Sequence, residues 1–294
     1  MPLSFQDALN LCAVETDALL ETLLPPDASP ARRLVEAMRY VALGQGKRLR
    51  PFLVIESASL FGVPRSQSLR VGAALECVHC YSLAHDDLPA MDDDDLRRGK
   101  PAVHKAFDEA TAILAGDALL TLAFEILAGE ATHPDAAVRL ALISGLARAS
   151  GLAGMVGGQM LDIEAESGVD STLSGITLIQ SLKTGALFKY ACEAGAILGQ
   201  ADPAPLRRYA EAIGLAFQIA DDILDVESTP EALGKATQKD SGRGKATFVD
   251  LLGLAEAKTR AAILMEEAIA SLSTYGERAT TLKQAAEFMV QRRS

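Results

Sequence analysis

The feature of this sequence that most limits its fold is the helical spacing of apolar residues along nearly the whole chain. Ala- and Leu-rich stretches with this period run at 10–28, 31–43, 51–61, 68–87, 108–128, 135–165, 174–198, 204–227, 248–272 and 277–291. No stretch alternates apolar and polar residues convincingly enough to indicate a strand. The sequence therefore predicts an all-α fold.

The breaks between these stretches are short, which favours one domain over two. They fall at Pro25–Pro26, Gly62–Pro64, His133–Pro134, Gly168–Ser171 and Ala201–Pro205. Each is a turn signal of a few residues and is too short for an interdomain linker. Hydrophobic residues make up 49% of the 294 residues and charged residues 23%, which is enough apolar material for a sizeable core. We expect a single-domain helical bundle spanning residues 1–294.

Charge and composition argue against several partners. The net charge of −11 argues against binding of a nucleic-acid backbone. The N-terminal segment carries Asp7, Glu15 and Asp17 and lacks the pattern of a secretory signal. Elsewhere, charged residues interrupt the apolar runs before they reach the ~18 residues of a membrane span. We expect a cytoplasmic protein with no nucleic-acid partner and no integral membrane association.

The four cysteines, Cys12, Cys77, Cys80 and Cys192, are too few for a disulfide framework and fit a reducing compartment. Cys77 and Cys80 form a C-x-x-C around His79, a spacing that zinc and redox sites also use. No second ligand pair with metal spacing is present in the sequence, and the segment has the pattern of a helix interior. We interpret these cysteines as small buried side chains.

A first acidic cluster follows an apolar helix and contains six aspartates within ten residues: Asp86, Asp87, Asp92, Asp93, Asp94 and Asp95. His79 and Asp86 are seven residues apart and share a helix face. Pro89 ends the regular helix, so Asp92 can fold back toward Asp86. Grouped carboxylates suit Mg2+, which commonly bridges protein carboxylates and substrate phosphates. A solvated acidic turn is the alternative for this segment.

A second cluster makes one polar stripe on an otherwise apolar helix. Gln218, Asp221, Asp222 and Asp225 stand at i, i+3, i+4 and i+7. A solvent-facing stripe would more often mix Lys with Glu, whereas this one contains only acids and an amide. It therefore indicates a cation as its partner. The glycine-turned loop of an EF-hand is missing from the sequence.

Basic residues stand next to both acidic clusters. They are Lys47, Arg48 and Arg50 in the segment Gly46–Pro51, then Arg97, Arg98 and Lys100, and finally Lys183, Lys235 and Lys245. Any one of them alone, such as Arg48 or Lys100, would more often be an ordinary surface charge. Together they suit diphosphate binding, because Arg supplies forked donors and Lys supplies point charges.

Five segments in this order along the chain carry a closer resemblance: GKRLRP, HDDLPAMDDDDLRRGKP, GGQMLDIEAE, SLKTGALF and FQIADDILD. Together they resemble the motifs of trans-isoprenyl diphosphate synthases, specifically the bacterial farnesyl diphosphate synthase type, over essentially the whole chain. The resemblance implies a helical bundle around a deep central cavity, with the two aspartate motifs facing each other across its mouth, usually in a homodimer. It also implies a Mg2+-dependent prenyltransferase that joins isopentenyl diphosphate head-to-tail to dimethylallyl and geranyl diphosphates, giving farnesyl diphosphate by ionisation, condensation and proton elimination.

The resemblance also implies roles for individual residues. Mg2+ ligands would be Asp86, Asp92 and Asp221, with Asp87, Asp222 and Asp225 in supporting positions. The allylic diphosphate would be held by Arg97, Lys183, Lys235 and Lys245. The diphosphate of isopentenyl diphosphate would be held by Lys47, Arg50, His79 and Arg98. Thr184 and Gln218 would lie beside the reacting carbon. This sequence departs from the family at Gln238, where Gly is frequent, and at Phe248–Val249, where Tyr-Pro is common.

Other functions remain open on the sequence. A terpene cyclase of the same fold is disfavoured because the chain has no Trp, only 5% aromatic residues and a second basic set. A non-catalytic partner subunit is disfavoured because both aspartate motifs are intact. A geranylgeranyl diphosphate synthase is the nearest alternative. Tyr81 favours the shorter C15 product, because a ring five residues before Asp86 lies ~7.5 Å below the metal ligands and can act as a floor for the growing chain.

Overall fold

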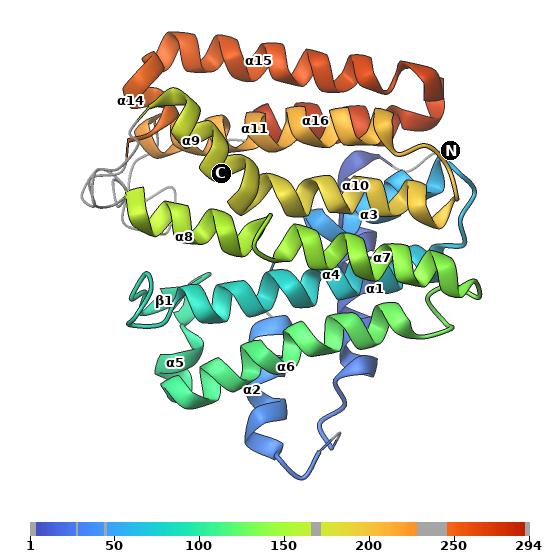
Figure 1. Cartoon of the computed structure of the whole chain (residues 1–294), viewed down its shortest axis with the longest axis vertical. Helices are drawn as coiled ribbons and strands as arrows, with labels where there is room; N and C mark the ends of the chain where they lie inside the picture. Colours follow the sequence, from blue (N-terminus) through green and yellow to red (C-terminus); the bar gives the residue numbers. More distant parts are fainter. Residues whose placement is uncertain (1–3, 28, 44–45, 166–171, 228–245, 292–294) are drawn as a thin grey trace. The chain divides into compact units, whose positions relative to one another are not determined.

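The computed structural model describes residues 4–27, 29–43, 46–165, 172–227 and 246–291. The chain divides into two compact units, Met1–Ile143 and Ser144–Ser294, and each is treated by itself. The boundary falls inside a helix, α7 (Ala136–Ser150), so no loop linker separates the units. Helices dominate the described residues, which confirms the all-α prediction (Figure 1). The single domain stays a prediction.

The first unit is built around one buried helix. Its helices are α1 (Phe5–Leu23), α2 (Arg32–Ala42), α3 (Leu49–Ser59), α4 (Arg65–Asp86), α5 (Val103–Ala106), α6 (Glu109–Ala128) and the start of α7. Helix α4 contacts α1, α2, α3 and α6, and every residue from 71 to 78 in it is buried. A helix covered on all sides needs apolar residues all round, which the sequence VGAALECV nearly supplies. Figure 1 shows α6 running back alongside α4.

The ends of these helices follow from capping side chains. The Ser4 hydroxyl accepts a hydrogen bond from the Asp7 backbone N–H at 3.2 Å, so α1 begins at Phe5 rather than at the predicted residue 10. The Phe5 ring packs edge-on against Phe52, with ring centroids 5.5 Å apart, which favours the earlier start. The Asp108 carboxylate caps α6 in the same way, accepting from Thr111 N–H at 2.7 Å.

A short hairpin connects α4 with α5, where the sequence pattern predicts no strand. Strand β1 (Leu96–Arg97) pairs antiparallel with β2 (Lys100–Pro101), and these are the only strands among the described residues. The two turn residues, Arg98 and Gly99, both have positive φ, as a two-residue hairpin turn requires. Strands of two residues are too short to show alternation in the sequence. The glycine of the turn, Gly99, is the one local signal that could have indicated this hairpin.

The second unit packs a group of helices around α11 (Ala204–Glu227). The others are the end of α7, α8 (Met155–Ala165), α9 (Leu173–Gln180), the π-helical turn η1 (Ser181–Gly185), α10 (Ala186–Leu198), α14 (Phe248–Leu252), α15 (Leu254–Ser271), the 3-10 segment η2 (Ser273–Ala279) and α16 (Thr280–Gln291). Helix α15 lies along α11 and α16 (Figure 1). Buried apolar residues from α9, α11, α14 and α15 form one cluster, with Ile219 and Phe248 at its junction with the acidic end of α11.

The cysteines are buried and free, as expected from the sequence. Burial, the largest cause, raises the pKa of Cys80 to about 12, so its thiol stays protonated at neutral pH. A protonated buried thiol is a poor metal ligand and a poor nucleophile. The C-x-x-C of Cys77 and Cys80 is therefore part of the packed interior of α4.

Two stretches, Glu109–Ala128 and Ala136–Ala165, are long and apolar enough by length and composition to cross a membrane. Charged residues interrupt both stretches, at Asp117 and Glu125 in the first and at Arg139 and Arg148 in the second, as the sequence led us to expect. A core helix of a water-soluble domain meets the same criterion, and α6, which is the first stretch, packs along α4.

Arg48 is a buried residue, although the sequence predicts a surface position for it. Its side chain is only 2% exposed and its backbone is left-handed, with φ of 49° at the start of α3. The guanidinium donates to Glu76 at 2.6 Å, to Asp17 at 2.7 Å and to the Ala42 carbonyl at 2.6 Å. Because Glu76 is buried as well, this ion pair connects α3 to the inside of α4.

Removing Arg48 should be costly, because it leaves the Glu76 carboxylate buried without its cation. We expect Arg48→Ala to lower the free energy of unfolding by ~3–5 kcal/mol. The control is Arg65→Ala, which breaks the Arg65–Glu15 pair of 2.6 Å between partly exposed side chains and should cost about 1 kcal/mol or less. Urea unfolding followed by circular dichroism measures both, and equal losses would contradict the structural role of Arg48.

Candidate functional site

The first aspartate motif lies at the end of α4, where the backbone folds back on itself. Asp92 N–H donates to the Asp86 carbonyl at 2.8 Å, and Asp94 N–H donates to the Asp87 carbonyl at 3.2 Å. This confirms the return of Asp92 toward Asp86 that Pro89 predicted. The side chains of Asp86 and Asp92 are half-buried. The turn therefore concentrates carboxylates at one end of a buried helix.

Asp87 is the most buried carboxylate of this turn, at 2% exposure, and Arg97 neutralises it. Arg97 Nε donates to Asp87 Oδ1 at 3.0 Å, and Arg97 Nη2 also contacts that oxygen. Asp94 lies 3.6 Å from the same guanidinium. Burial, the largest cause, raises the pKa of Asp87, while the contact with Arg97 opposes this shift. Arg97, predicted to hold a diphosphate, is thus occupied with a carboxylate in this structure.

A basic group gathers in the same unit. The Arg98 guanidinium lies against Gly46, where an added Cβ would come within 2.7 Å of Arg98 Nη1. His79 feels the charges of Arg50 and Arg98, and burial together with these charges lowers the pKa of His79 well below its usual range. His79 therefore lies within reach of the charges of Arg50 and Arg98. Lys47 lies next to Gly46 in the chain and is exposed.

A small pocket of about 40 Å³ opens beside Arg97 and Arg98. Its lining comprises Tyr40, Val41, Leu83, Asp87, Arg97, Arg98, Lys100, Pro101, Ala102 and Val103. The volume compares with the ~30 Å³ of one water molecule, so a diphosphate enters only if the arginines move.

The second aspartate motif lies on α11, in the second unit. Gln218, Asp221, Asp222 and Asp225 are all partly buried there. Asp222 Oδ2 accepts a hydrogen bond of 2.7 Å from the backbone N–H of Phe248, the first residue of α14. Asp222 thereby helps to hold the start of α14, and its predicted role at a metal stays a prediction.

Lys183 and Thr184 lie in the π-helical turn η1, a distortion that often occurs at functional sites. Lys183 Nζ donates to Asp162 Oδ2 at 2.6 Å, and Asp162 is only 7% exposed. The close approach of α8 to η1 depends on Gly158, because a Cβ there would lie 2.2 Å from the Lys183 backbone nitrogen. No role for Asp162 followed from the sequence, although it stands within the GGQMLDIEAE segment.

Several predicted site residues lie outside the described residues. They are Lys235, Lys245 and the atypical Gln238. Among the described ones, unit 1 holds Asp86, Asp87, Asp92, Lys47, Arg50, His79, Arg97 and Arg98. Unit 2 holds Lys183, Thr184, Gln218, Asp221, Asp222 and Asp225.

Known proteins that resemble this chain do so over almost its whole length. The family profile described as polyprenyl synthetase matches residues 31–289. A farnesyl diphosphate synthase of Escherichia coli is 45% identical, with 99% of each chain covered, and one of Haemophilus influenzae is 43% identical, again with 99% of each covered. A crystal structure described as an apo FPP/GFPP synthase from Zymomonas mobilis is 51% identical, with a TM-score of 0.89, covering 97% of this chain and 98% of the other.

The contact between α8 and η1 generates a first prediction for this site. Gly158→Ala should force the backbone of η1 away and lower the free energy of unfolding by ~1–3 kcal/mol, because a Cβ meets backbone atoms that cannot rotate aside. Gly185→Ala, in the same turn, is the control: its Cβ would stand 3.5 Å from the Gln180 carbonyl oxygen, an ordinary contact, and should not destabilise. Chemical unfolding of both variants checks this, and equal stability would contradict the close approach.

The neutral state of His79 generates a second prediction. Below about pH 6.5, His79 of the unfolded chain binds a proton while the folded protein, with its lowered pKa, does not. Protonation then favours unfolding, so the free energy of unfolding should fall by up to ~1.4 kcal/mol per pH unit as the pH drops from about 6.5 toward 5. In His79→Gln this decline should be shallower. Urea titrations at several pH values test this, and identical slopes for variant and wild type would be the contrary result.

Proposed function

The chain belongs to the polyprenyl synthetase family, and we propose that it is a short-chain trans-prenyltransferase that makes farnesyl diphosphate. Its substrates are isopentenyl diphosphate and the allylic dimethylallyl and geranyl diphosphates. The near full-length similarity to farnesyl diphosphate synthases carries the proposal. Two intact aspartate motifs with basic residues beside them support it, because the reaction needs to hold two diphosphates and to stabilise one that leaves.

The donor atoms of the aspartate motifs fit Mg2+. Asp86 and Asp92 offer only carboxylate oxygens and are joined through the backbone hydrogen bond of the turn. Asp221 and Asp225 offer the same donors on α11, while Asp87 and Asp222 are partly occupied by Arg97 and by Phe248 N–H. Bound there, Mg2+ would supply the positive charge that stabilises a departing diphosphate.

Each basic side chain has a defined task in this proposal. Arg97 and Lys183, with Lys235 and Lys245, hold the allylic diphosphate. Arg97 exchanges part of its contact with Asp87 for the diphosphate oxygens, and Lys183 does the same with Asp162. Lys47, Arg50, neutral His79 and Arg98 hold the diphosphate of isopentenyl diphosphate.

The chemistry at carbon depends on dipoles rather than on a protein base. Thr184 and Gln218 direct their oxygen atoms toward the positive charge that develops on the allylic carbon. No candidate protein base stands out near these residues in the sequence. This fits the mechanism that the family resemblance implies, in which the released pyrophosphate takes the proton lost after condensation.

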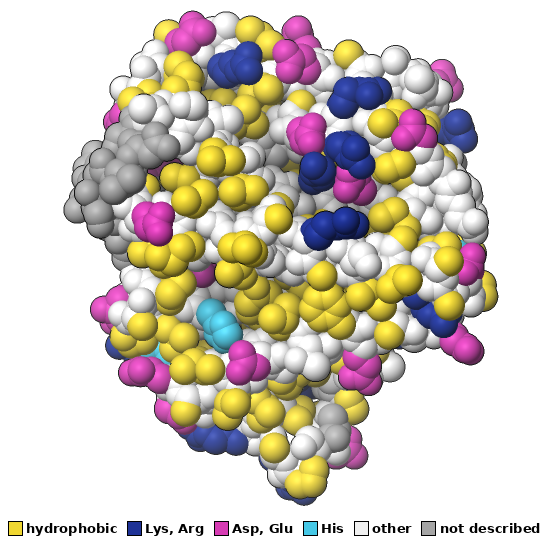
Figure 2. Space-filling view, in the orientation of Figure 1, with side chains coloured by type: hydrophobic (Ala, Val, Ile, Leu, Met, Phe, Trp, Pro, Cys, Tyr) yellow, Lys and Arg dark blue, Asp and Glu magenta, His cyan; other side chains and the backbone are white. Residues whose placement is uncertain are grey.

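We further place the protein in the cytoplasm as a homodimer. The free cysteines fit a reducing compartment. Large apolar side chains are exposed on α6 (Ile113 and Leu114) and on α8 (Val156 and Met160), which suits a partner surface. Figure 2 shows that apolar side chains, coloured together with Ala and Pro, are exposed among charged ones on the face in view.

The test of this function is turnover in variants of each aspartate motif. Asp86→Ala and Asp221→Ala should each lose at least ~100-fold in kcat, which corresponds to about 3 kcal/mol of transition-state stabilisation. Asp135→Ala, at an exposed helix start where Asp135 accepts from Ala137 N–H, is the control and should keep normal activity. Near-normal rates in either site variant would overturn the assignment of that motif.

The same assay separates the rival functions. Purified protein with Mg2+, isopentenyl diphosphate and dimethylallyl diphosphate is followed by mass spectrometry of the dephosphorylated products. A synthase gives linear prenyl alcohols, a terpene cyclase gives cyclic products, and a non-catalytic subunit gives none.

Tyr81 generates the prediction for product length. It lies on α4 five residues before Asp86, is 6% exposed, and its ring stands edge-on to His85 with centroids 5.7 Å apart. A rigid buried ring at that depth can stop the growing chain at C15. We expect Tyr81→Ala to remain active and to make C20 or longer products, while Tyr81→Phe, which keeps the ring, still stops at C15. Mass spectrometry with excess isopentenyl diphosphate measures this, and an active Tyr81→Ala enzyme that stops at C15 would disprove the role of Tyr81.

A further inference from the structure

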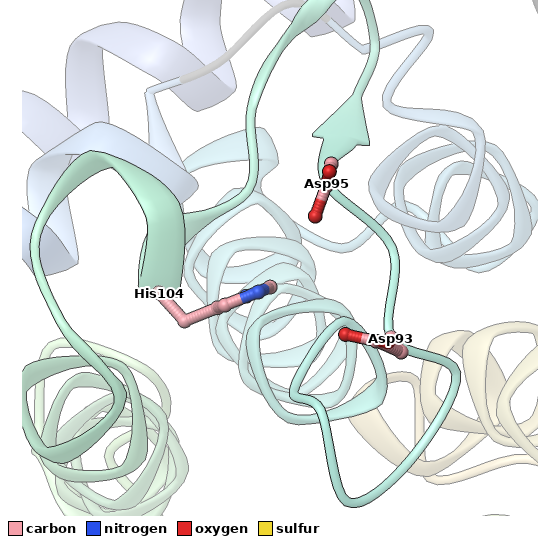
Figure 3. Close-up of side chains that lie close together, drawn as sticks. All are labelled: Asp93, Asp95 and His104. Atoms are coloured by element: carbon pink, nitrogen blue, oxygen red, sulfur yellow. The ribbon is translucent and has the colours of Figure 1, made fainter.

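Three side chains with no individual role above converge on one point of the first unit: Asp93, Asp95 and His104. Their ligand atoms all lie within 4.8 Å of one another. Figure 3 shows the His104 ring extending from α5 toward the space between the two carboxylates, which reach it from the turn and from the start of the hairpin. The group is separate in composition from the aspartates proposed to hold Mg2+.

His104 is the unusual member of this group. It is only 7% exposed, and neither of its ring nitrogens has a hydrogen-bond partner among the described residues. Buried polar atoms are nearly always satisfied, so an imidazole left without any partner indicates that a ligand completes its surroundings. A neutral imidazole presents one nitrogen lone pair, which suits a metal ion.

The backbone holds the three residues in place. Asp93 has φ of 49°, and its N–H donates to the Leu88 carbonyl at 3.1 Å. The Asp95 carbonyl accepts from Ala102 N–H at 2.8 Å, which closes the hairpin just before the helix that carries His104. The backbone at Asp93, at Asp95 and just before His104 is therefore held by hydrogen-bonded segments before any ligand arrives.

A cation that would compete with a metal ion for Asp95 is Lys105, and its ion pair with Asp95 is weak. Lys105 Nζ lies 2.9 Å from Asp95 Oδ1, but both side chains are well exposed, at 45% and 72%. An exposed ion pair of this kind contributes little and leaves the second carboxylate oxygen available. Two carboxylates and a neutral imidazole together present two negative charges, which match a divalent cation.

The donor set selects among divalent cations. Mg2+ favours oxygen ligands throughout, whereas imidazole favours the later transition metals, with Zn2+ among them. Zinc sites with three protein ligands and a water in the fourth position are common. Donors around Zn2+ stand ~3.4 Å apart, given bonds of about 2.0–2.1 Å, so the exposed carboxylates need to close in by about an ångström.

We propose that Asp93, Asp95 and His104 form a second metal site, one that binds a transition-metal dication of the Zn2+ type. It is independent of the proposed prenyltransferase function and does not use Asp86, Asp92 or Asp221. An ion at this point joins the turn after α4 to α5 and thereby braces the hairpin that carries Arg97 and Arg98. Its occupancy therefore stabilises the first unit.

The four histidines of the chain allow a direct test. Zn2+ is titrated into metal-free, full-length protein with 15N-labelled histidine, and ring nitrogen shifts are followed by NMR. One His104 ring nitrogen should shift saturably at one equivalent, while His79, His85 and His133 stay unchanged. Calorimetry should show Zn2+ affinity weakened at least ~10-fold in His104→Gln and in Asp93→Asn.

Two controls distinguish Zn2+ bound at His104 from Zn2+ bound elsewhere on the chain. His133→Gln removes a second buried histidine, whose Nδ1 already accepts from Asp135 N–H at 3.1 Å, and should leave Zn2+ affinity unchanged. Asp93 is exposed, so Asp93→Asn should fold normally even if His104→Gln does not. Absence of any His104 shift up to millimolar Zn2+ would overturn the proposal. So would Zn2+ affinity that survives in Asp93→Asn but disappears in Asp86→Ala, since the ion would then sit in the first aspartate motif.

Discussion

The ion pair between Asp87 and Arg97 is the interaction on which the geometry of the acidic turn depends. Six aspartates follow one another within ten residues, and mutual repulsion would spread them apart if nothing opposed it. Arg97 reaches back from the hairpin to the most buried of them, so the pair fixes the hairpin to the end of α4. The remaining carboxylates of the turn are half-buried or exposed.

The same rule governs two other ion pairs of the interior, in which each charge has a specific partner. Arg48 and Glu76 neutralise each other inside the first unit, and Lys183 and Asp162 do so in the second. Burying an unpaired charge is strongly unfavourable, so these pairs restrict which packings of the helices are stable. Two of the pairs, Asp87–Arg97 and Lys183–Asp162, use residues proposed to bind diphosphate. An arriving diphosphate therefore competes with a carboxylate that already satisfies the cation, which weakens diphosphate binding and favours release of product.

His104 departs from this rule because its ring nitrogens have no partner in the described structure. Its neighbours, Asp93 and Asp95, belong to the same run of aspartates as the predicted Mg2+ ligands, yet they point to a different donor set. One acidic run can thus serve two purposes.

The sequence by itself determined the helices, the two aspartate motifs, the return of Asp92 toward Asp86 and the family resemblance. These depend on spacing along the chain, on the fixed geometry of a helix and on the conformation of proline, all of which are local. Only the tertiary structure decided that Arg48 is buried, that Arg97 holds Asp87, that Asp162 holds Lys183 and that His104 meets Asp93 and Asp95. Each of those outcomes depends on which distant segments pack together. A charged side chain takes its partner from whatever segment lies next to it, so sequence spacing alone could name Arg97 and Lys183 but could not pair them, and it did not single out Asp162 or His104.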